Sequence, residues 1–289
     1  MTQVSPLDVG ALGVLGIFAG WLGAVIGIGG GVVIVPALVL VFGYDVRVAV
    51  AASLVTVITT STAAGSAYVG SGLANMRLGM TLEIGTTLGG LTGGLIAVLV
   101  SPSLIAGLFA AMMLVTALLV VRSREARPPP SARPASSPKT GYETRGTLAG
   151  AYLDERSGAL VEYRAERLLL GGPVSFLAGI VSGLLGVGGG FLKVPAMTLG
   201  MRVPVKVAAA TSNFMIGVTA VSSLFVYFAR GYVHPFVAAP VALGVGLGAL
   251  AGTRTAAWIS PRALSWILAV VLASIGVQMG LAAFGVRLG

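Results

Sequence analysis

The chain has 289 residues, of which 56% are hydrophobic and only 9% are charged. Soluble globular domains carry about 25% charged residues, so water is the wrong solvent for most of this sequence. The chain contains no cysteine, which excludes disulfides, thiolate metal sites and cysteine nucleophiles. Its net charge of +9 comes without a basic patch interleaved with aromatic residues, and we therefore expect no nucleic-acid partner.

Long uncharged stretches dominate the chain, among them residues 11–43 and 84–121. Each exceeds the roughly 20 residues that a helix needs to cross the hydrocarbon core of a bilayer. The first stretch has no basic region before it and no small-residue cleavage site, so we expect it to be retained rather than removed as a signal peptide. The sequence therefore predicts an all-α polytopic membrane protein surrounded by the lipid bilayer.

A decapeptide with a glycine cluster and a trailing proline occurs twice, as GIGGGVVIVP at 27–36 and GVGGGFLKVP at 186–195. The copies are 159 positions apart, and the same offset matches Ser53 with Ser212, Tyr68 with Tyr227, and Ser101 and Pro102 with Ser260 and Pro261. Position-specific matches of polar residues and proline indicate a duplication rather than shared low complexity. We predict a first membrane repeat at 8–121, a linker at 122–170 and a second membrane repeat at 171–285.

The linker opens with RSREARPPPSARPASSPKT, a composition typical of a flexible segment. Its second part, AYLDERSGALVEYRAERL, alternates apolar and polar residues on both sides of Ser157 and Gly158, which predicts a short β-hairpin outside the membrane. A disordered tether is the alternative. The linker carries nine of the eighteen Lys and Arg residues, so the positive-inside rule places it in the cytoplasm.

Each half holds one apolar segment that breaks at the glycine cluster and three that follow it, in the first half at 46–69, 77–100 and 104–121. If the broken segment enters the membrane and returns, each half crosses an odd number of times and the second half is inverted. Both termini then lie outside, and the cytoplasmic side gains Arg77, Arg202, Lys206, Arg254 and Arg262. We therefore predict two inverted-topology repeats, each a glycine-broken helical hairpin plus three transmembrane helices, as in many secondary transporters.

The glycine breaks are the first candidate for a site. Backbone that is not helical at membrane depth must line a cavity or meet protein, because its polar groups need partners. The half-helices that follow, 32–42 and 191–201, would point free N–H groups at that cavity, which favours an anion. The predicted substrate-binding glycines are Gly29, Gly30, Gly31, Gly188, Gly189 and Gly190. Close helix packing of small residues is the alternative explanation.

Polar side chains near the breaks extend the candidate site. Lys193 lies in the first turn after the second break, where a cation opposes the helix dipole, so a bound anion explains it better than helix stability does; snorkelling to the interface is the alternative. Ser53, Ser212 and Asn213 offer neutral hydrogen-bond donors to an oxyanion, or else bond between helices. Glu83, about two turns into its segment, is a candidate proton carrier for coupling.

The motifs together carry a resemblance. The duplicated G-[IV]-G-G-G-x-x-x-[VI]-P pattern, GLLGVGGGFLKVP with KVAAATSNF, and the linker residues Tyr152, Asp154, Gly158 and Tyr163 resemble the sulfite exporter TauE/SafE family of membrane permeases. The resemblance covers nearly the whole chain. It implies transport, usually export, of small sulfur-containing anions such as sulfite or sulfoacetate, across a bacterial inner membrane. The first copy departs from the second, with Ile34 in place of Lys193 and Leu54 in place of Asn213, so any site is asymmetric.

The sequence thus predicts a secondary transporter of small sulfur-containing anions that works by alternating access. A gated anion channel, or a permease for other small organic anions, is the alternative. The apolar segments hold no paired carboxylates, no metal-ligand cluster and no pair of nucleophile and base, so we expect no enzyme activity, no metal and no cofactor.

Overall fold

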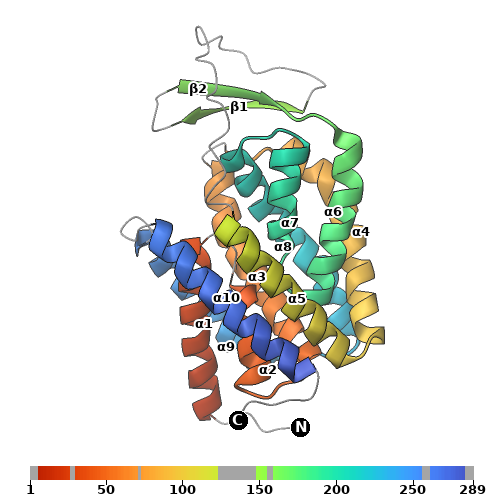
Figure 1. The fold of residues 1–289 in the computed structure, drawn as a ribbon, viewed down its shortest axis with the longest axis vertical. Helices are drawn as coiled ribbons and strands as arrows, with labels where there is room; N and C mark the ends of the chain where they lie inside the picture. The colour runs from red at the N-terminus through yellow and green to blue at the C-terminus, as the bar shows by residue number, and fades with distance from the viewer. Residues whose placement is uncertain are drawn as a thin grey trace.

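The computed structural model describes residues 6–26, 30–70, 73–122, 148–154, 159–255 and 261–283. These ranges form a bundle of long helices with one two-stranded sheet (Figure 1). The elements in chain order are α1 (Pro6–Ile26), α2 (Gly31–Leu40), α3 (Val46–Gly70), α4 (Met76–Leu99), α5 (Pro102–Arg122), β1 (Ala149–Asp154), β2 (Ala159–Arg164), α6 (Leu168–Leu185), α7 (Gly190–Pro195), the π-helix η1 (Ala196–Gly200), α8 (Val205–Ala229), α9 (Pro235–Thr255) and α10 (Pro261–Ala283).

Local sequence explains where several of these helices begin. Pro102, Pro235 and Pro261 each occupy the first position of a helix, where the missing N–H is no loss and the fixed φ angle suits the helix. Asn75 caps α4, since its side-chain oxygen accepts a hydrogen bond of 3.0 Å from the Leu78 N–H. The predicted segments 46–69, 77–100 and 104–121 therefore correspond to α3, α4 and α5 within a few residues.

Within the described ranges, four helices are long and apolar enough to cross a membrane by length and composition: α3, α4, α8 and α9. Shorter apolar stretches lie in α1, α2, α5, α6 and α10. Large hydrophobic side chains also cover the outside of the bundle, for instance Leu99, Phe225 and Phe236, which are about two-thirds exposed or more. An apolar exterior of this kind suits contact with lipid, and the chain is a multi-pass membrane protein.

The elements of the two halves correspond at the offset found in the sequence. The matched starts are Gly31 and Gly190 for α2 and α7, Val46 and Val205 for α3 and α8, Met76 and Pro235 for α4 and α9, and Pro102 and Pro261 for α5 and α10. Packing follows the same correspondence: α1 packs on α9 as α6 packs on α4, while α3 packs on α8 and α5 on α10. Helices of one half thus pack mainly against the other half, and neither half forms a bundle alone.

Glycines permit the closest of these helix contacts. A Cβ atom on Gly89 of α4 would overlap the carbonyl oxygen of Phe176 in α6, and a Cβ on Gly248 of α9 would overlap that of Ile17 in α1. Gly248 corresponds to Gly89, and Phe176 to Ile17, at the offset of 159. Backbones approach this closely in membranes because packing, rather than the hydrophobic effect, holds transmembrane helices together.

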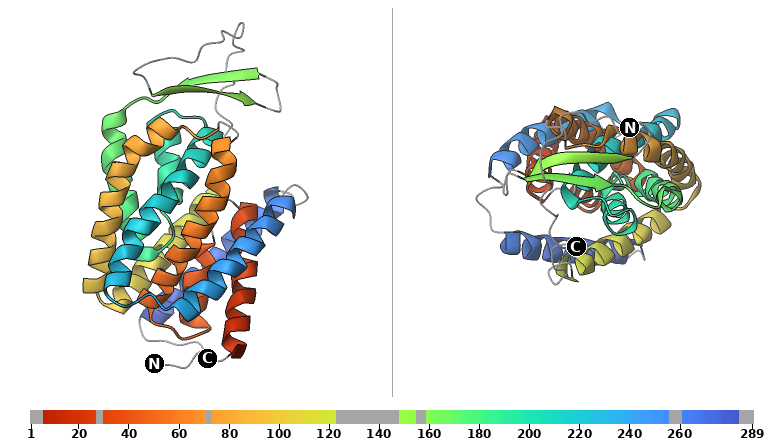
Figure 2. Two further views of the ribbon diagram at one scale, coloured as in Figure 1. Left: turned by 180° about the vertical axis from the view of Figure 1, so that it is seen from behind. Right: turned by 90° about the horizontal axis from the view of Figure 1, so that it is seen from above.

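Each glycine-broken segment returns to the end of the bundle at which it starts. In the first half, Tyr44 follows α2 and lies near Asp8 at the start of α1; burial raises the pKa of the Tyr44 phenol above its ordinary value, and the Asp8 carboxylate raises it further. In the second half, the Glu166 N–H, just before α6, donates to the Met201 carbonyl just after η1 at 3.0 Å. Figures 1 and 2 show the start of α1 and the β-hairpin at opposite ends of the molecule. The two broken segments therefore enter the bundle from opposite ends.

The second half-helix differs from the single helix predicted at 191–201. The α-helix ends at Pro195, and residues 196–200 continue as a π-helix in which the Met201 N–H reaches back to the Ala196 carbonyl at 3.2 Å. Proline cannot donate a backbone hydrogen bond, which weakens the regular α-helical pattern at this point. The prediction of a uniform half-helix is corrected to a short α-helix followed by a π-helical turn.

The predicted β-hairpin is present and docks on the bundle. β1 and β2 pair antiparallel, with Tyr152 opposite Val161 and Gly150 opposite Tyr163. The Asn75 amide donates to the Tyr163 hydroxyl at 3.1 Å, and Tyr152 and Tyr163 pack on a buried cluster that includes Leu78. Because Asn75 belongs to the first half and Met201 to the second, the hairpin region contacts both halves at one end. The turn at 155–158 lies outside the described residues.

Candidate functional site

The two glycine breaks meet inside the bundle. The Ser53 hydroxyl of α3 donates to the carbonyl of Gly186 at 2.7 Å, so a residue of the first half directly contacts the second break. A Cβ on Gly31 would lie 2.6 Å from the Ser53 hydroxyl oxygen and 2.8 Å from the Gly186 carbonyl oxygen. Gly31, Ser53 and Gly186 therefore form one contact between the halves. Gly29, also predicted here, lies outside the described residues.

The second break has a backbone that only glycine adopts easily. Gly188 and Gly189 have φ angles of +77° and +67°, and α6 ends at Gly186 with φ +69°. A Cβ on Gly189 would lie 2.7 Å from the Ala178 carbonyl oxygen. Gly30 in the first half is different, since its φ of −67° is helical. The glycines are thus required by conformation in the second break, and by close approach at Gly31 in the first.

Lys193 projects from α7 into the protein rather than toward an interface. Its side chain is 1% exposed, and its ammonium donates to the Thr219 hydroxyl oxygen of α8 at 2.8 Å. The Thr219 hydroxyl in turn lies 2.7 Å from Glu83 Oε1 of α4 and donates to it, while Glu83 Oε2 lies 3.9 Å from Lys193 Nζ. The structure thus joins a lysine, a threonine and a carboxylate from three helices. We call Glu83, Lys193 and Thr219 the charged cluster.

Hydrogen bonding within the charged cluster is incomplete. An ammonium has three donors, and among the described residues Lys193 Nζ makes one hydrogen bond. Glu83 Oε2 is buried and has no hydrogen-bond partner in the described part of the chain. Burying an ion pair costs several kcal/mol per ion unless its polar groups are well paired. An unpaired carboxylate oxygen beside an ammonium with spare donors marks a place where a ligand or a proton would be stabilised.

Two more buried hydroxyls face the second break without a partner. A Cβ added to Gly190 would lie 3.4 Å from Ser212 Oγ. A Cβ added to Gly189 would lie 3.3 Å from the Ser182 Cβ. Within the described ranges neither hydroxyl oxygen has a hydrogen-bond partner. Buried hydroxyls are normally paired, so both are free to donate to a solute at the break.

The predicted residues therefore have different surroundings. Ser212 and the second-break glycines lie together, and Lys193 with Glu83 forms the charged cluster. The Ser53 hydroxyl already donates to Gly186, and the Asn213 amide donates to Ala209 of its own helix at 3.1 Å.

Sequence reasoning named Thr219 among the polar residues of α8 without selecting it for the site, and it passed over Ser182. Thr219 is one of several polar residues in α8, and nothing in its spacing distinguishes it from Ser212 or Asn213. Ser182 lies four residues before Gly186, one helical turn from the break, and this spacing could have identified it.

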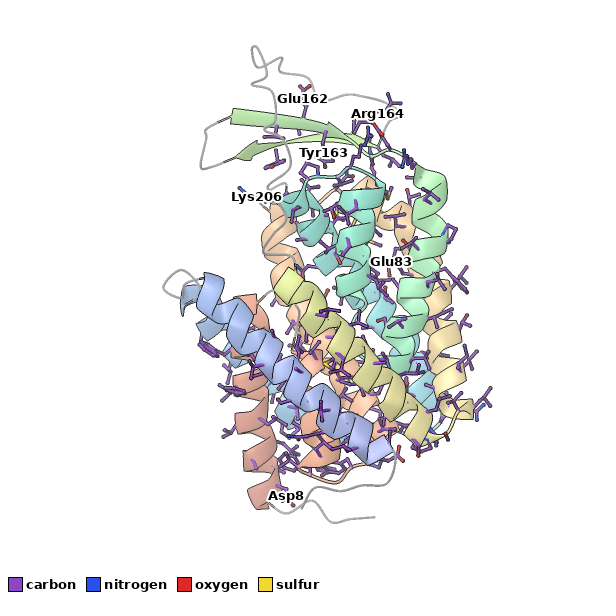
Figure 3. The ribbon with its side chains drawn as sticks, in the orientation of Figure 1. Asp8, Glu83, Glu162, Tyr163, Arg164 and Lys206 are labelled. Carbon is purple, nitrogen blue, oxygen red and sulfur yellow. The ribbon has the colours of Figure 1, made fainter. Side chains whose placement is uncertain are left out.

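Figure 3 shows how exceptional the position of Glu83 is among the labelled charged residues. Glu83 lies among the helices of the bundle, whereas Asp8 lies at one end and Glu162, Arg164 and Lys206 at the end that carries the hairpin. Ionisable groups are expensive within a membrane and usually mark functional sites. The contrast favours a role for Glu83 in the interior rather than a role in solubility.

Two other cations, Arg47 and Arg202, have structural partners. Arg47 donates to the carbonyls of Ala97 and Val100 at the end of α4, at 3.2 and 2.6 Å, and lies over the ring of Tyr232. Arg202 pairs with Glu166 at 3.2 Å, and both side chains are largely exposed. Arg47 thus stabilises a helix C-terminus and Arg202 the docked hairpin region, which leaves Lys193 as the described cation best placed to meet a buried solute.

An open groove between α1 and α9 is not part of this site. It is lined by apolar residues such as Val9, Ile17, Phe236 and Leu243. The charged cluster lies on α4, α7 and α8 instead. A groove without polar groups offers an anion no hydrogen bonds, and we assign it to contact with lipid.

Comparison with known proteins agrees with this architecture. The family model described as "Sulfite exporter TauE/SafE" matches residues 12–279. A protein of Bacillus subtilis (strain 168) named "Probable membrane transporter protein YunE" is 29% identical over 273 residues, which cover 92% of this chain and 95% of that protein. A probable membrane transporter protein of Methanocaldococcus jannaschii is 25% identical over 281 residues, covering 92% of this chain and 93% of its own. No solved structure matches the chain.

Proposed function

Because the chain belongs to the sulfite exporter TauE/SafE family, we propose that it is a secondary transporter that exports small sulfur-containing anions, such as sulfite or organosulfonates, by alternating access. The observation that carries the proposal is the buried Lys193 ammonium, which has spare donors and lies one helical turn beyond the glycine break. Transport involves no bond-breaking step, so the proposal includes no catalytic residue and no cofactor.

The chemistry around the second break suits an oxyanion. Sulfite and sulfonate groups present several oxygen acceptors, and the break offers the unpaired hydroxyls of Ser182 and Ser212. The Cβ positions of Gly188 and Gly190 lie 2.6 Å from Ile216, and that of Gly189 lies 2.7 Å from the Ala178 carbonyl oxygen, so a solute reaches this backbone when these neighbours move apart. We place the anion between this break and Lys193, with Gly30, Gly31 and Ser53 of the first half on the opposite side. Asn213 borders the site only if its side chain leaves Ala209.

Alternating access is supported by the way the halves interlock. The two broken segments enter from opposite ends and meet at Gly31 and Gly186. Inverted repeats with broken helices at the centre give two related states, one open to each side. A tilt of one pair of packed helices against the other would expose the breaks to the two sides in turn.

We further propose that the hairpin end faces the cytoplasm of a bacterial cell, with the protein in its inner membrane. Arg77, Arg202 and Lys206 lie at this end, whereas Arg47 and Arg230 lie at the other. An excess of basic residues on one side is the signature of the cytoplasmic face. Cysteines introduced into the cysteine-free chain at Thr2, Ser136 and Leu288 test the topology: an impermeant thiol reagent should label the two termini in intact cells. Labelling of Ser136 instead would refute it.

The transport proposal is tested in liposomes that contain the purified protein. Uptake of sulfite and methanesulfonate should saturate with concentration, and preloaded unlabelled anion should accelerate it by counterflow. Sulfate, taurine and acetate serve as comparison solutes. Absence of both binding and flux for sulfite and for every sulfonate would refute the proposed substrate class.

A gated anion channel is the competing function, since the same polar path would serve it. A channel gives flux that does not saturate in the same range and shows no counterflow. The unpaired Glu83 oxygen favours a transporter, because a channel gains nothing from a titratable carboxylate beside its only described buried cation.

A further inference from the structure

We propose that Glu83 and the transported anion compete for the Lys193 ammonium, and that the Thr219 hydroxyl serves both states, so that one proton moves with each anion. The inference rests on the proposed anion transport and assigns its coupling. Glu83 carries the proton, Lys193 binds the anion, and Thr219 is a positioning residue between them.

The first step is the geometry of the pair. Lys193 Nζ bonds Thr219 at 2.8 Å, but it stands 3.9 Å from Glu83 Oε2, beyond hydrogen-bond distance. The carboxylate therefore neutralises the ammonium by charge without occupying its remaining donors. Glu83 acts as an internal substitute for an external anion, close enough to balance the charge and loosely enough held to be displaced.

The second step is charge balance. An anion that reached Lys193 while Glu83 stayed ionised would place two negative charges beside one positive charge. Like charges this close inside a protein repel strongly, because the interior screens them much less than water does. Uptake of a proton by Glu83 removes this repulsion and keeps the cluster neutral. In this step hydronium from the water gives up a proton, so one O–H bond breaks there and one forms on the carboxylate; the proton returns to water when the anion leaves.

The third step is the hydroxyl of Thr219, which has one hydrogen and two acceptors within reach. The hydroxyl oxygen lies 2.7 Å from Glu83 Oε1 and 3.1 Å from the Met215 carbonyl oxygen. With Glu83 ionised, the hydrogen points to the carboxylate. With Glu83 protonated, the carboxyl donates to Thr219, whose hydrogen turns to Met215. The Thr219 oxygen accepts from Lys193 in both states, so the ammonium stays in place.

The surroundings of Glu83 leave Lys193 as its titratable partner. Near Glu83, α6 meets α4 with Gly172, Ser175 and Phe176, and α8 contributes Thr219. Among the described residues of α7 and η1, Lys193 is the one titratable group. The nearest others on the elements packed against α4 lie toward the helix ends: Arg77, Arg47, Lys206 and Tyr227.

The duplication supplies a natural reference for this cluster. At the offset of 159, Ile34 corresponds to Lys193, Thr60 to Thr219 and Ala242 to Glu83. The related position thus keeps the threonine and loses both charges together. In the described part of the chain, the Thr60 hydroxyl bonds carbonyls of its own helix, those of Thr56 and Val57, each at 3.1 Å. A purely structural role for the threonine would be the same in both places, so Thr60→Val is the matched control for Thr219→Val.

The test uses proteoliposomes with a pH-sensitive dye and methanesulfonate, whose charge does not change with pH. In the parent protein, methanesulfonate uptake should carry protons, and an imposed pH gradient should drive its accumulation. Glu83→Gln resembles the protonated carboxyl. It should abolish proton movement and gradient-driven accumulation while it retains anion counterflow. A Glu83→Gln variant that still moves protons with the anion would overturn the inference.

Thr219→Val should weaken methanesulfonate or sulfite binding roughly tenfold, about 1.4 kcal/mol, and shift its pH profile, whereas Thr60→Val should change neither. Equal behaviour of the two valine variants would overturn the role of Thr219. The outcomes also separate the two proposals. If the parent neither binds nor moves any sulfur anion, the proposed function fails. If it moves the anion without a proton, only the coupling fails.

Discussion

The two glycine breaks come from one duplicated sequence, yet the residues that the structure describes at each break differ. The second break has three glycines with positive φ, a short α-helix, a π-helical turn and a buried lysine. The first resumes at Gly31 as an ordinary helix, and Ile34 packs in the apolar core where the second copy has Lys193. Under the proposed function, the first copy supports the site and the second copy binds the anion. The two charges of the cluster nevertheless come from different halves, since Glu83 belongs to the first half and Lys193 to the second.

The largest expected difference between the copies follows from their side chains at the matched position. Lys193→Met leaves the buried Glu83 carboxylate without a counter-charge, which costs about 3–5 kcal/mol, and it should abolish transport. Ile34→Met replaces one apolar core residue by another of similar volume and should cost less than about 1.5 kcal/mol. Thermal unfolding in detergent and anion flux measure both effects.

A double variant separates charge from packing in this comparison. Glu83→Gln combined with Lys193→Met removes both charges and should restore much of the stability, because buried ion pairs are often replaceable by neutral groups. It should not restore anion binding. A double variant that binds sulfite like the parent would place the anion elsewhere, and a double variant no more stable than Lys193→Met would show that packing dominates.

The second expected difference concerns the glycines themselves. In Gly189→Ala the new Cβ would lie 2.7 Å from the Ala178 carbonyl oxygen, on a residue with φ +67°. A left-handed conformation alone costs a non-glycine residue roughly 1–2 kcal/mol. The close contact adds to this, so the loss of stability should be larger. Gly30→Ala keeps a helical φ of −67°, and its Cβ would lie 3.3 Å from the Ala19 carbonyl oxygen, which requires only a small shift, so it should destabilise the protein much less. Equal loss of stability and transport in both variants would contradict the asymmetry.

Much of this asymmetry could not be predicted from the sequence. The duplication, the positions of the breaks, helices α3 to α5 and the hairpin follow from matched residues and apolar periodicity. The contact between Glu83 and Lys193 does not, because it joins positions 110 residues apart through helix packing. The short length of α7 was missed for another reason: both copies contain the proline, and only the second continues as a π-helix. Local sequence fixes where a helix stops, whereas packing decides how it continues.

A third comparison sets the two matched serines against each other. The Ser53 hydroxyl satisfies the buried Gly186 carbonyl, so Ser53→Ala should cost about 1–3 kcal/mol of stability. Among the described residues the Ser212 hydroxyl has no partner, so Ser212→Ala should leave stability nearly unchanged and instead weaken anion binding. Unfolding curves with and without sulfite distinguish the two. A sulfite-induced stabilisation that survives fully in Ser212→Ala would remove this hydroxyl from the site.

The smallest expected effect lies at the hairpin, which holds the end of the second broken segment and has no counterpart at the first among the described residues. Burial raises the pKa of the Tyr163 phenol above its ordinary value of 10.0, while the hydrogen bond from Asn75 opposes this and Tyr152 adds to it. A raised pKa means that the docked hairpin favours the neutral phenol. Its contribution is therefore complete below about pH 10 and is lost as the pH rises through the folded-state pKa.

A fluorophore on Glu162→Cys, in this otherwise cysteine-free chain, should report loosening of the hairpin as the pH rises above about 10. In Tyr163→Phe the transition should disappear, because no phenol remains to ionise at that position. Loss of the Asn75 hydrogen bond should itself cost only about 0.5–1.5 kcal/mol. An unchanged alkaline transition in Tyr163→Phe would show that a group other than the Tyr163 phenol controls it.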